Sequence, residues 1–182
     1  MCIRDSPFLK DFYTDRGRHA FQTQMHFLFS RFQQQRNLRQ MELFSERMVA
    51  DYLFQKDRIF ASLTLSEREL ALYERLVGWL ELEVMKPDVV VFLQATTDVL
   101  MERIAKRARP FEKDMDRAYI HDLNEAYNHF FFHYSEAPLL VVNTNAIDFV
   151  NNTEDFEDLR RRIVTHRQGT TYYAPIERGQ SA

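Results

Sequence analysis

Between residues 87 and 108 the sequence changes directly from a strand-like run into a helix-like run. The first part, PDVVVFLQA, is apolar, rich in valine and too short for a buried helix, which indicates a strand buried on both faces. The second part, TTDVLMERIAKRA, opens with Thr96 or Thr97 as N-cap and carries Asp98 in its first turn, as expected of a helix. A strand that feeds straight into a helix favours folds in which the two alternate around a parallel sheet.

The rest of the chain continues this alternation. The segment PLLVVNT at residues 138–144 predicts a second buried strand, and MVADYLF at residues 48–54 predicts a short strand ending at Asp51. Helices are predicted over residues 16–36, with an apolar stripe of Phe21, Met25, Leu28 and Phe32; over 63–84, with Ser66 and Glu69 in capping-box spacing; near 115–134; and over 152–167. We therefore predict an α/β three-layer fold with a parallel sheet.

Ligands of such sheets bind beyond the carboxyl ends of the strands. Three predicted strand ends carry polar residues: Asp51, Gln94 to Thr96, and Asn143 to Asn145. We expect the functional site to lie there.

Composition narrows the class of protein. A chain of 182 residues fits one domain, and its net charge of −3 argues against broad nucleic-acid binding. Cys2 is the only cysteine, and the sequence shows neither a transmembrane run nor a signal peptide, so we expect a cytoplasmic protein without membrane association. His129 and His133 stand four apart, but no third ligand accompanies them and no metal site is predicted. Trp79 falls in an apolar helix and is predicted to belong to the core.

The stretch RIAKRARPFEKD at residues 103–114 concentrates positive charge in this mildly acidic chain. Arg103 and Arg107 share one helix face, and Arg109 lies just beyond in the turn before Pro110. Guanidinium forks suit phosphate oxygens, so the three arginines predict a phosphate clamp. A solvated basic helix end favoured by the helix dipole explains the same pattern, and the stretch by itself leaves both readings open.

Three segments, PFLKDFYTDRGRHAFQTQMHFLFSRFQQQ, VADYLFQKDRIFA and RIAKRARPFE, occur in an order and spacing that resemble the deoxynucleoside kinase family, especially its bacterial deoxyadenosine and deoxyguanosine kinase members. The resemblance covers about residues 7–175. It implies a fold similar to thymidylate kinases and transfer of the γ-phosphoryl group of ATP, with Mg²⁺, to the 5′-hydroxyl of a deoxynucleoside.

The resemblance also implies the roles of residues around the nucleoside. Tyr13 would contact the sugar 3′-hydroxyl and Gln24 would pair with the base, for which a carboxamide offers a donor and an acceptor together. Arg31 resembles a further site arginine, Asp57 resembles an acid near the base, and Phe60 would stack on the base. A surface glutamine, a core phenylalanine and a cap or loop carboxylate are the structural alternatives for Gln24, Phe60 and Asp57.

Residues near the phosphates follow from the same resemblance. Asp51 would accept the proton of the 5′-hydroxyl, with a structural carboxylate as the alternative. Tyr52, kept among the substrate-binding residues, stands where many relatives have arginine. The segment RIAKRARPFE resembles the lid of the family. This resemblance implies that Arg103, Arg107 and Arg109 bind the ATP phosphates and that Glu112 contacts the sugar hydroxyl. The predicted catalytic residues are Asp51, Arg103, Arg107 and Arg109. The predicted substrate-binding residues are Tyr13, Gln24, Arg31, Tyr52, Asp57, Phe60 and Glu112.

Family members begin with a strand, a glycine-rich phosphate loop and a second, acidic strand. The sequence has four glycines and no such loop motif. Residues 1–6, MCIRDS, are interpreted as a non-native leader. We expect residues 7–182 to form an incomplete P-loop kinase-like domain that lacks the first strand, the phosphate loop and the second strand, and to be inactive as written.

Other features of the intact protein follow from the resemblance or stay open. A purine deoxynucleoside is the favoured substrate, and a homodimer through the long helices is expected, although core burial explains the same apolar stripes. A nucleoside-binding or regulatory module without catalysis is the alternative function. A single-strand nucleic-acid binder is a weaker alternative because of the negative net charge.

Overall fold

The computed structural model describes residue 8 and residues 15–42, 47–108 and 115–175. They fall into two compact units that meet in the sequence at Met85 and Lys86. Three predicted site residues, Tyr13, Arg109 and Glu112, lie outside the described residues. The predicted leader at residues 1–6 lies outside them as well.

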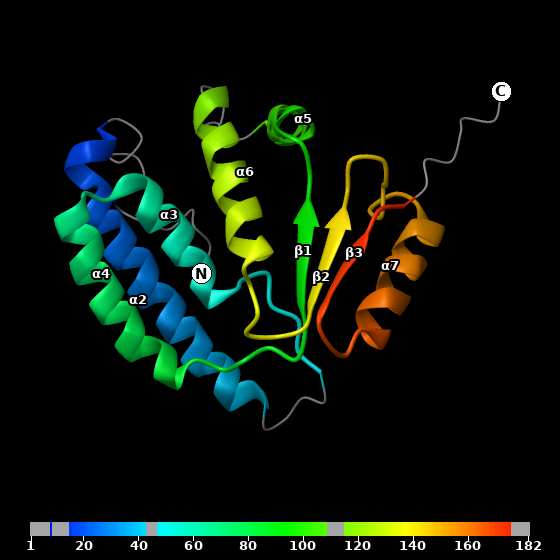
Figure 1. Ribbon diagram of the computed structural model, residues 1–182, viewed down its shortest axis with the longest axis horizontal. Helices are drawn as coiled ribbons and strands as arrows, with labels where there is room; N and C mark the ends of the chain where they lie inside the picture. The colour runs from blue at the N-terminus through cyan, green and yellow to red at the C-terminus, as the bar shows by residue number, and fades with distance from the viewer. Residues whose placement is uncertain (1–7, 9–14, 43–46, 109–114, 176–182) are drawn as a thin grey trace. The chain divides into compact units, whose positions relative to one another are not determined.

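The first unit is helical (Figure 1). It contains α2 (Arg16–Glu42), η2 (Phe54–Lys56), α3 (Asp57–Thr64), α4 (Glu67–Leu80) and η3 (Glu81–Glu83). Its core joins Leu28 of α2, Ala61 of α3, and Tyr73 and Val77 of α4 around Phe54. The apolar stripe predicted on the first helix therefore faces the core, and the helix runs six residues beyond its predicted end.

Two polar features secure α3 and α4. The Glu69 carboxylate accepts hydrogen bonds from the backbone N–H and the hydroxyl of Ser66, at 3.0 and 2.6 Å, so the predicted capping box is confirmed. Arg58 on α3 donates to Glu74 on α4 at 2.9 Å and to Glu81 on η3 at 2.8 Å. Helix α3 itself was not predicted, because its eight residues are too few for a clear period.

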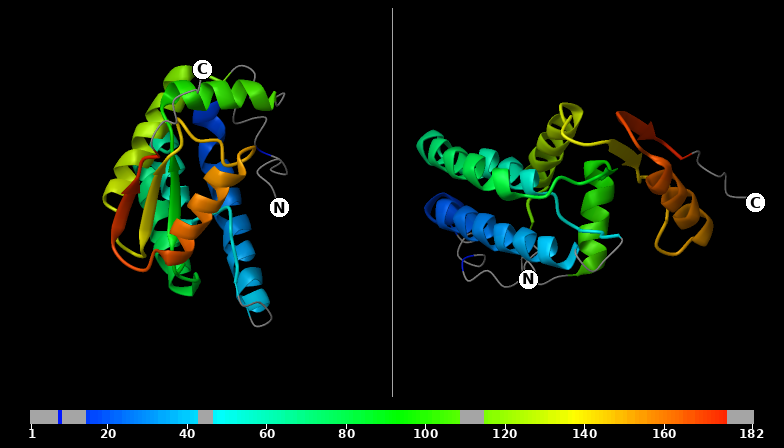
Figure 2. Two further views of the ribbon diagram at one scale, coloured as in Figure 1. Left: turned by 90° about the vertical axis from the view of Figure 1, so that its right-hand side faces the viewer. Right: turned by 90° about the horizontal axis from the view of Figure 1, so that it is seen from below.

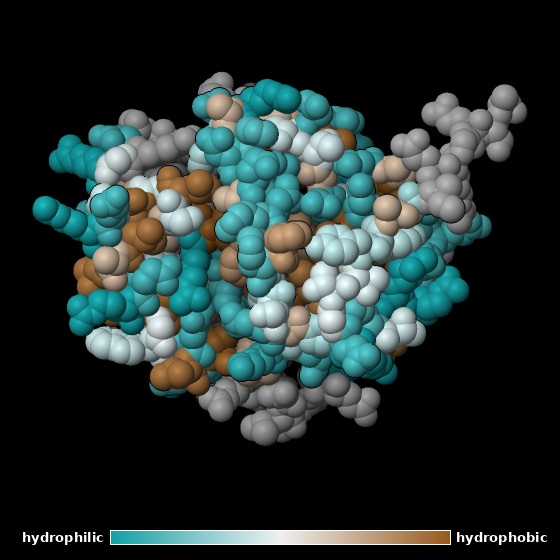
Figure 3. Space-filling model, in the orientation of Figure 1, coloured by the Kyte–Doolittle hydropathy of each residue, from teal (hydrophilic) through white to brown (hydrophobic). Residues whose placement is uncertain are grey.

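Two sequence predictions about this unit are wrong. Residues 48–51 are exposed and form no strand, since no ladder hydrogen bond joins them to another described segment, and a strand needs such a partner. Trp79 is 67% exposed instead of lying in the core. It follows Val77 by two residues, which turns it about 200° away from the buried face of α4. Figure 3 shows hydrophobic side chains at the surface over this part of the chain.

The second unit is built on a parallel sheet with the strand order β1–β2–β3. The strands are β1 (Val90–Gln94), β2 (Leu139–Asn143) and β3 (Thr170–Tyr173), and the helices are α5 (Thr97–Arg107), α6 (Arg117–Phe132) and α7 (Thr153–Thr165). The first two strands and all three helices were predicted. Strand β3 was not, because TTYY is short, mostly exposed and not an apolar run.

Both faces of this sheet carry a helix. Leu140 and Val142 pack against Leu159 of α7, whereas Phe92 stacks on Phe131 of α6 with ring centroids 4.2 Å apart. Because Phe92 and Val91 point to opposite faces and Val91 belongs to the α7 side, α6 and α7 cover opposite faces (Figure 2). This three-layer arrangement agrees with the predicted fold class and with the need of a parallel sheet to be covered on both sides.

The two crossover connections have opposite hands. Strands β1, β2 and β3 follow one another across the sheet, so both connections step in the same direction while their helices lie on opposite faces. The β1–β2 connection is right-handed, and the β2–α7–β3 connection is left-handed, which is rare in parallel sheets (Figures 1 and 2). Strand β2 is buried as predicted, but Leu93 of β1 is 46% exposed, so β1 is not buried on both faces.

A three-residue cluster fastens β3 to α7. The Tyr173 hydroxyl donates to the Asp158 carboxylate at 2.5 Å, and the Arg162 Nε donates to the same oxygen at 2.9 Å. The Arg162 guanidinium lies 3.7 Å from the centroid of the Tyr173 ring. The hydrogen bond from Tyr173, and next the one from Arg162, hold the pKa of Asp158 below its ordinary value.

This cluster predicts an acid-dependent loss of stability. Because the pKa of Asp158 is lower in the folded chain than in the unfolded chain, its contribution is full above the unfolded value of about 3.9 and is lost as the pH falls through the folded value. Urea unfolding measured between pH 6 and pH 2.5 should show a shallower acid decline in Asp158→Asn than in the wild type. Asp122→Asn, at an exposed position of α6, serves as the control, and equal declines in all three proteins would contradict the prediction.

Candidate functional site

Gln24 is buried at the interface of α2 and α3. It is 3% exposed, and its Nε2 donates to the hydroxyl of Thr64 at 3.1 Å, while that hydroxyl donates to the Phe60 carbonyl at 2.7 Å. The Gln24 Oε1 atom is buried and accepts no hydrogen bond from the described residues. The alternative of a surface glutamine is therefore wrong. An amide oxygen in this state is suited to accept a hydrogen bond from a bound ligand.

Arg31 and Asp57 form a buried ion pair two helical turns from Gln24. Their side chains are 11% and 2% exposed, and the Arg31 guanidinium also lies 4.1 Å from the centroid of the Tyr52 ring. Asp57 opens α3, where the positive end of the helix dipole favours a carboxylate. Gln24 with Thr64 and Arg31 with Asp57 thus form two cross-links between α2 and α3. Asp57 is therefore not a loop carboxylate, but its place at the start of α3 fits the alternative of a carboxylate at a helix end.

Burial changes the titration of two neighbours of this pair. The pKa of the Tyr52 hydroxyl is raised by burial, against the opposing effect of Arg31, so the phenol stays neutral. The pKa of Lys56 is lowered first by burial and then by the positive charge of Arg31, while Asp51 acts in the opposite direction. Lys56 was missed by the sequence analysis, because a lysine within the polar stretch Gln55 to Arg58 gives no signal before its spatial neighbours are known.

The remaining predicted residues of the first unit differ in burial. Asp51 is exposed and lies at a bend rather than at the end of a strand. Phe60 is half-buried on α3. The structure therefore brings Arg31, Tyr52 and Asp57 together, with Gln24 two turns away on α2.

In the second unit, Arg103 is turned onto the carboxyl end of β2. Its two terminal nitrogens donate to the hydroxyl and the carbonyl of Thr144, at 2.9 and 2.6 Å. Thr144 is fully buried, and its hydroxyl donates in turn to the Gln94 carbonyl of β1 at 2.9 Å. Arg107, one turn further along α5, is exposed. The two arginines predicted to act together thus have different surroundings, and Arg103 ties α5 to the sheet.

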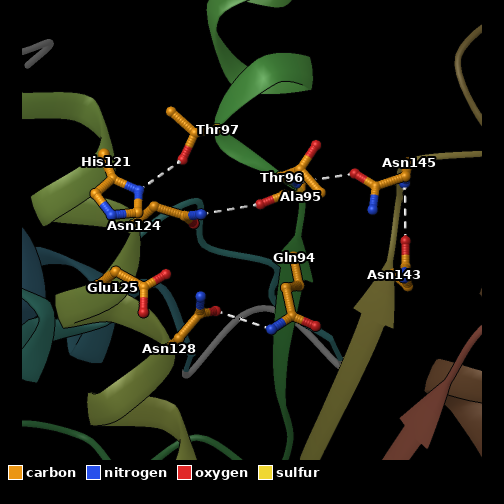
Figure 4. Close-up of a pocket in the computed structure, with 10 residues that line it drawn as sticks. All are labelled: Gln94, Ala95, Thr96, Thr97, His121, Asn124, Glu125, Asn128, Asn143 and Asn145. Atoms are coloured by element: carbon orange, nitrogen blue, oxygen red, sulfur yellow. Dashed lines mark hydrogen bonds between the residues drawn. The ribbon is translucent and has the colours of Figure 1, made fainter. Parts of the chain in front are cut away.

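A pocket with a volume of about 380 Å³ lies at the carboxyl ends of β1 and β2 (Figure 4). It gathers Gln94 to Thr96 and Asn143 with Asn145, the strand-end residues from which the sequence predicted a site, and adds polar side chains from α6. Among the described residues, neither lysine nor arginine lines it, and His121 does. The pocket thus lies at two of the three predicted strand ends where the sequence placed the functional site, and its functional role stays a prediction.

Known proteins match most of the chain. The family model for deoxynucleoside kinases matches residues 2–167. A deoxyguanosine kinase of Bacillus subtilis is 33% identical over 169 residues, covering 90% of this chain and 80% of the relative. A deoxyadenosine kinase of Dictyostelium discoideum is 32% identical over 155 residues, covering 82% of this chain and 61% of the relative.

Solved structures agree at the level of the fold. The deoxyadenosine kinase of M. mycoides with bound dATP superposes with a TM-score of 0.75 at 23% identity, covering 91% of this chain and 84% of that one. The same enzyme with bound dCTP gives a TM-score of 0.72 at 21% identity. The fold is thus that of the P-loop kinase class. Within this class, the chain belongs to the deoxynucleoside kinase family, whose members are ATP-dependent nucleoside kinases.

The buried ion pair generates a stability prediction. Arg31→Met or Asp57→Leu alone leaves a buried charge without its partner and should lower the free energy of unfolding by about 3–5 kcal/mol. The double variant Arg31→Met/Asp57→Leu should recover most of this loss, since it removes both charges. Urea unfolding measures all three. Glu74→Gln is the control, because its half-exposed pair with Arg58 should contribute about 1 kcal/mol or less. Additive losses in the double variant would contradict the prediction.

Proposed function

We propose that this chain carries the nucleoside-binding part of an ATP-dependent deoxynucleoside kinase, with a purine deoxynucleoside as the favoured acceptor. The observation that supports it best is the buried Oε1 of Gln24, which lacks a partner among the described residues beside an amide nitrogen that is already engaged. An oxygen in this environment suits a ligand that donates N–H groups, as the exocyclic amine and the ring N–H of nucleobases do. The names of the deoxyguanosine and deoxyadenosine kinase relatives support the preference for purines.

The charged residues would divide the work of phosphoryl transfer. Asp51, which is exposed, would orient the 5′-hydroxyl and accept its proton. Arg107 would donate to the phosphate oxygens, and Arg103 would do so with the guanidinium N–H groups that Thr144 does not use. In the same proposal Arg109 belongs to the clamp, Tyr13 and Glu112 bind the sugar, Phe60 stacks on the base, and Arg31, Tyr52 and Asp57 shape the base site.

ATP chemistry of this kind implies Mg²⁺. Among the residues that the structure describes, no three His, Cys, Asp or Glu side chains are grouped so that they would hold a metal ion. We therefore assign no magnesium ligand to this chain. No described helix combines the length and apolar character needed to cross a membrane.

Nucleoside binding tests the proposal. Calorimetric titration of the chain with deoxyguanosine and deoxyadenosine should show binding that is weakened about tenfold or more in Gln24→Leu, because the buried amide contact is lost. Gln22→Leu, at an exposed position on the same helix, should bind as the wild type does. Residues 1–182 contain no glycine-rich phosphate loop motif, so we expect no phosphoryl transfer from ATP by this chain. Absence of nucleoside binding would overturn the proposal, and turnover would overturn the expected inactivity.

We further propose that the chain forms a homodimer through the outer face of α4 and η3. Leu72, Trp79 and Leu82 are 48%, 67% and 85% exposed there, and an exposed apolar patch is typical of an interaction surface. A twofold contact would bury the same patch on both copies.

Trp79 is the only tryptophan and reports this contact directly. Its fluorescence should shift to shorter wavelength as protein concentration rises, and sedimentation should show a dimer that Trp79→Lys converts to a monomer. Val164→Lys makes the same change at an exposed site on α7 and should leave the dimer intact. A monomeric wild type at all concentrations would exclude the proposed dimer.

A further inference from the structure

The pocket at the ends of β1 and β2 is lined mainly by carboxamides. Gln94 comes from β1, Asn143 and Asn145 from β2 and the residues after it, and Asn124 and Asn128 from α6. Its volume of about 380 Å³ lies within the range of small-molecule sites. Neither the deoxynucleoside kinase resemblance nor the proposed function gives these side chains a role.

Internal hydrogen bonds orient each carboxamide and engage only part of it (Figure 4). Gln94 donates to Asn128 Oδ1 at 2.8 Å, and Asn124 donates to the Ala95 carbonyl at 3.2 Å. These bonds leave the carbonyl oxygens of Gln94 and Asn124 as acceptors and the Asn128 amide as a donor.

The β2 side of the pocket adds further donors. Asn145 Oδ1 accepts from the Thr96 backbone N–H at 2.9 Å, and Asn143 Oδ1 accepts from the Asn145 backbone N–H at 3.0 Å. The amide nitrogens of Asn143 and Asn145 therefore have no partner among the described residues. The pocket thus presents donors and acceptors that are already fixed in direction.

The side chains of the lining disfavour anionic ligands. Among the described residues, the lining contains the carboxylate of Glu125 and neither lysine nor arginine, and it also contains His121, whose Nδ1 lies 3.4 Å from the Thr97 hydroxyl. The first turn of α5, which starts beside the pocket, already contains Asp98, and Asp98 pairs with Arg117 at 2.7 Å. A phosphate would therefore meet a carboxylate and neither lysine nor arginine among the described lining residues.

We propose that this pocket binds an uncharged purine, as a free base or a nucleoside, at a site separate from Gln24. The adjacent N–H donor and ring-nitrogen acceptor of adenine match a carboxamide in two hydrogen bonds, and several carboxamides converge here. The proposal goes beyond the proposed function and does not depend on it.

Side-chain amide resonances report this site directly. Nitrogen-15 correlation spectra of the whole chain are recorded during titration with adenine, deoxyadenosine and dAMP, and the amide signals are assigned by single Asn→Asp and Gln→Glu variants. Adenine and deoxyadenosine should shift the Asn128 and Asn145 signals saturably, and dAMP should bind several-fold more weakly. Ribose as a fourth ligand tests whether the sugar alone suffices, which would overturn the assignment to a base.

Two variants test the chemistry. Asn128→Leu should weaken adenine binding about tenfold, and Asp122→Asn, an exposed position on the same helix, should not change it. Glu125→Gln should bring the affinity for dAMP close to that for deoxyadenosine, because it removes the carboxylate of the described lining. The spectra themselves show whether each variant is folded. Unchanged adenine binding in a folded Asn128→Leu protein would overturn the proposal.

Titration of Gln24→Leu separates this inference from the proposed function. If the pocket amides shift as in the wild type, the inference holds whatever happens at Gln24. If deoxyadenosine shifts the Gln24 signal of the wild type and leaves the pocket amides unmoved at saturation, the inference is wrong and the proposed function stands. Shifts confined to the pocket amides would support the inference and contradict nucleoside binding at Gln24.

Discussion

The buried pair of Arg31 and Asp57 is the interaction on which the candidate nucleoside site depends. Two nearly inaccessible charges are tolerable only when each satisfies the other, so α2 and α3 are held to one relative arrangement. The hydrogen bond between Gln24 and Thr64 lies two turns away on the same two helices and depends on the same relative arrangement of α2 and α3. The positive charge of Arg31 also lies over the Tyr52 ring and lowers the pKa of Lys56. One ion pair therefore sets both geometry and electrostatics in this unit.

Thr144 has a comparable place in the second unit. Its backbone N–H and its hydroxyl both bond to the Gln94 carbonyl, which joins β2 to β1 beyond the end of the ladder. The same residue accepts two hydrogen bonds from Arg103, which joins α5 to the sheet. Because Thr144 is buried, loss of these bonds would leave polar atoms without partners. The carboxyl end of the sheet, where the polar pocket opens, is thus rigidly built.

Local sequence signals predicted the structure correctly where the residues that form the signal also make the stabilising contact. The caps Ser66 and Thr96 satisfy backbone groups within a few residues, so they act before any tertiary contact forms. The apolar runs of β1 and β2 were recognised because a parallel sheet buries such runs, although their backbone hydrogen bonds join segments distant in the sequence. The prediction of a strand ending at Asp51 was wrong, because a strand exists only where a second strand completes its hydrogen bonds. Strand β3 was missed because it is recruited by β2 and by Tyr173, not by an apolar run of its own.

The sequence by itself determined the α/β alternation, the cluster of polar residues at the ends of β1 and β2, and the family, since these depend on period, capping and motif spacing. Only the tertiary structure decided which side chains became buried and which partners they found. Gln24 and Asp57 proved buried, whereas Trp79 proved exposed, although all three lie on helices that also carry apolar residues. Burial depends on which face of a helix meets another element, and that is settled by packing between segments distant in the sequence. The same packing turned Arg103 toward Thr144, a contact that spans 41 residues of chain.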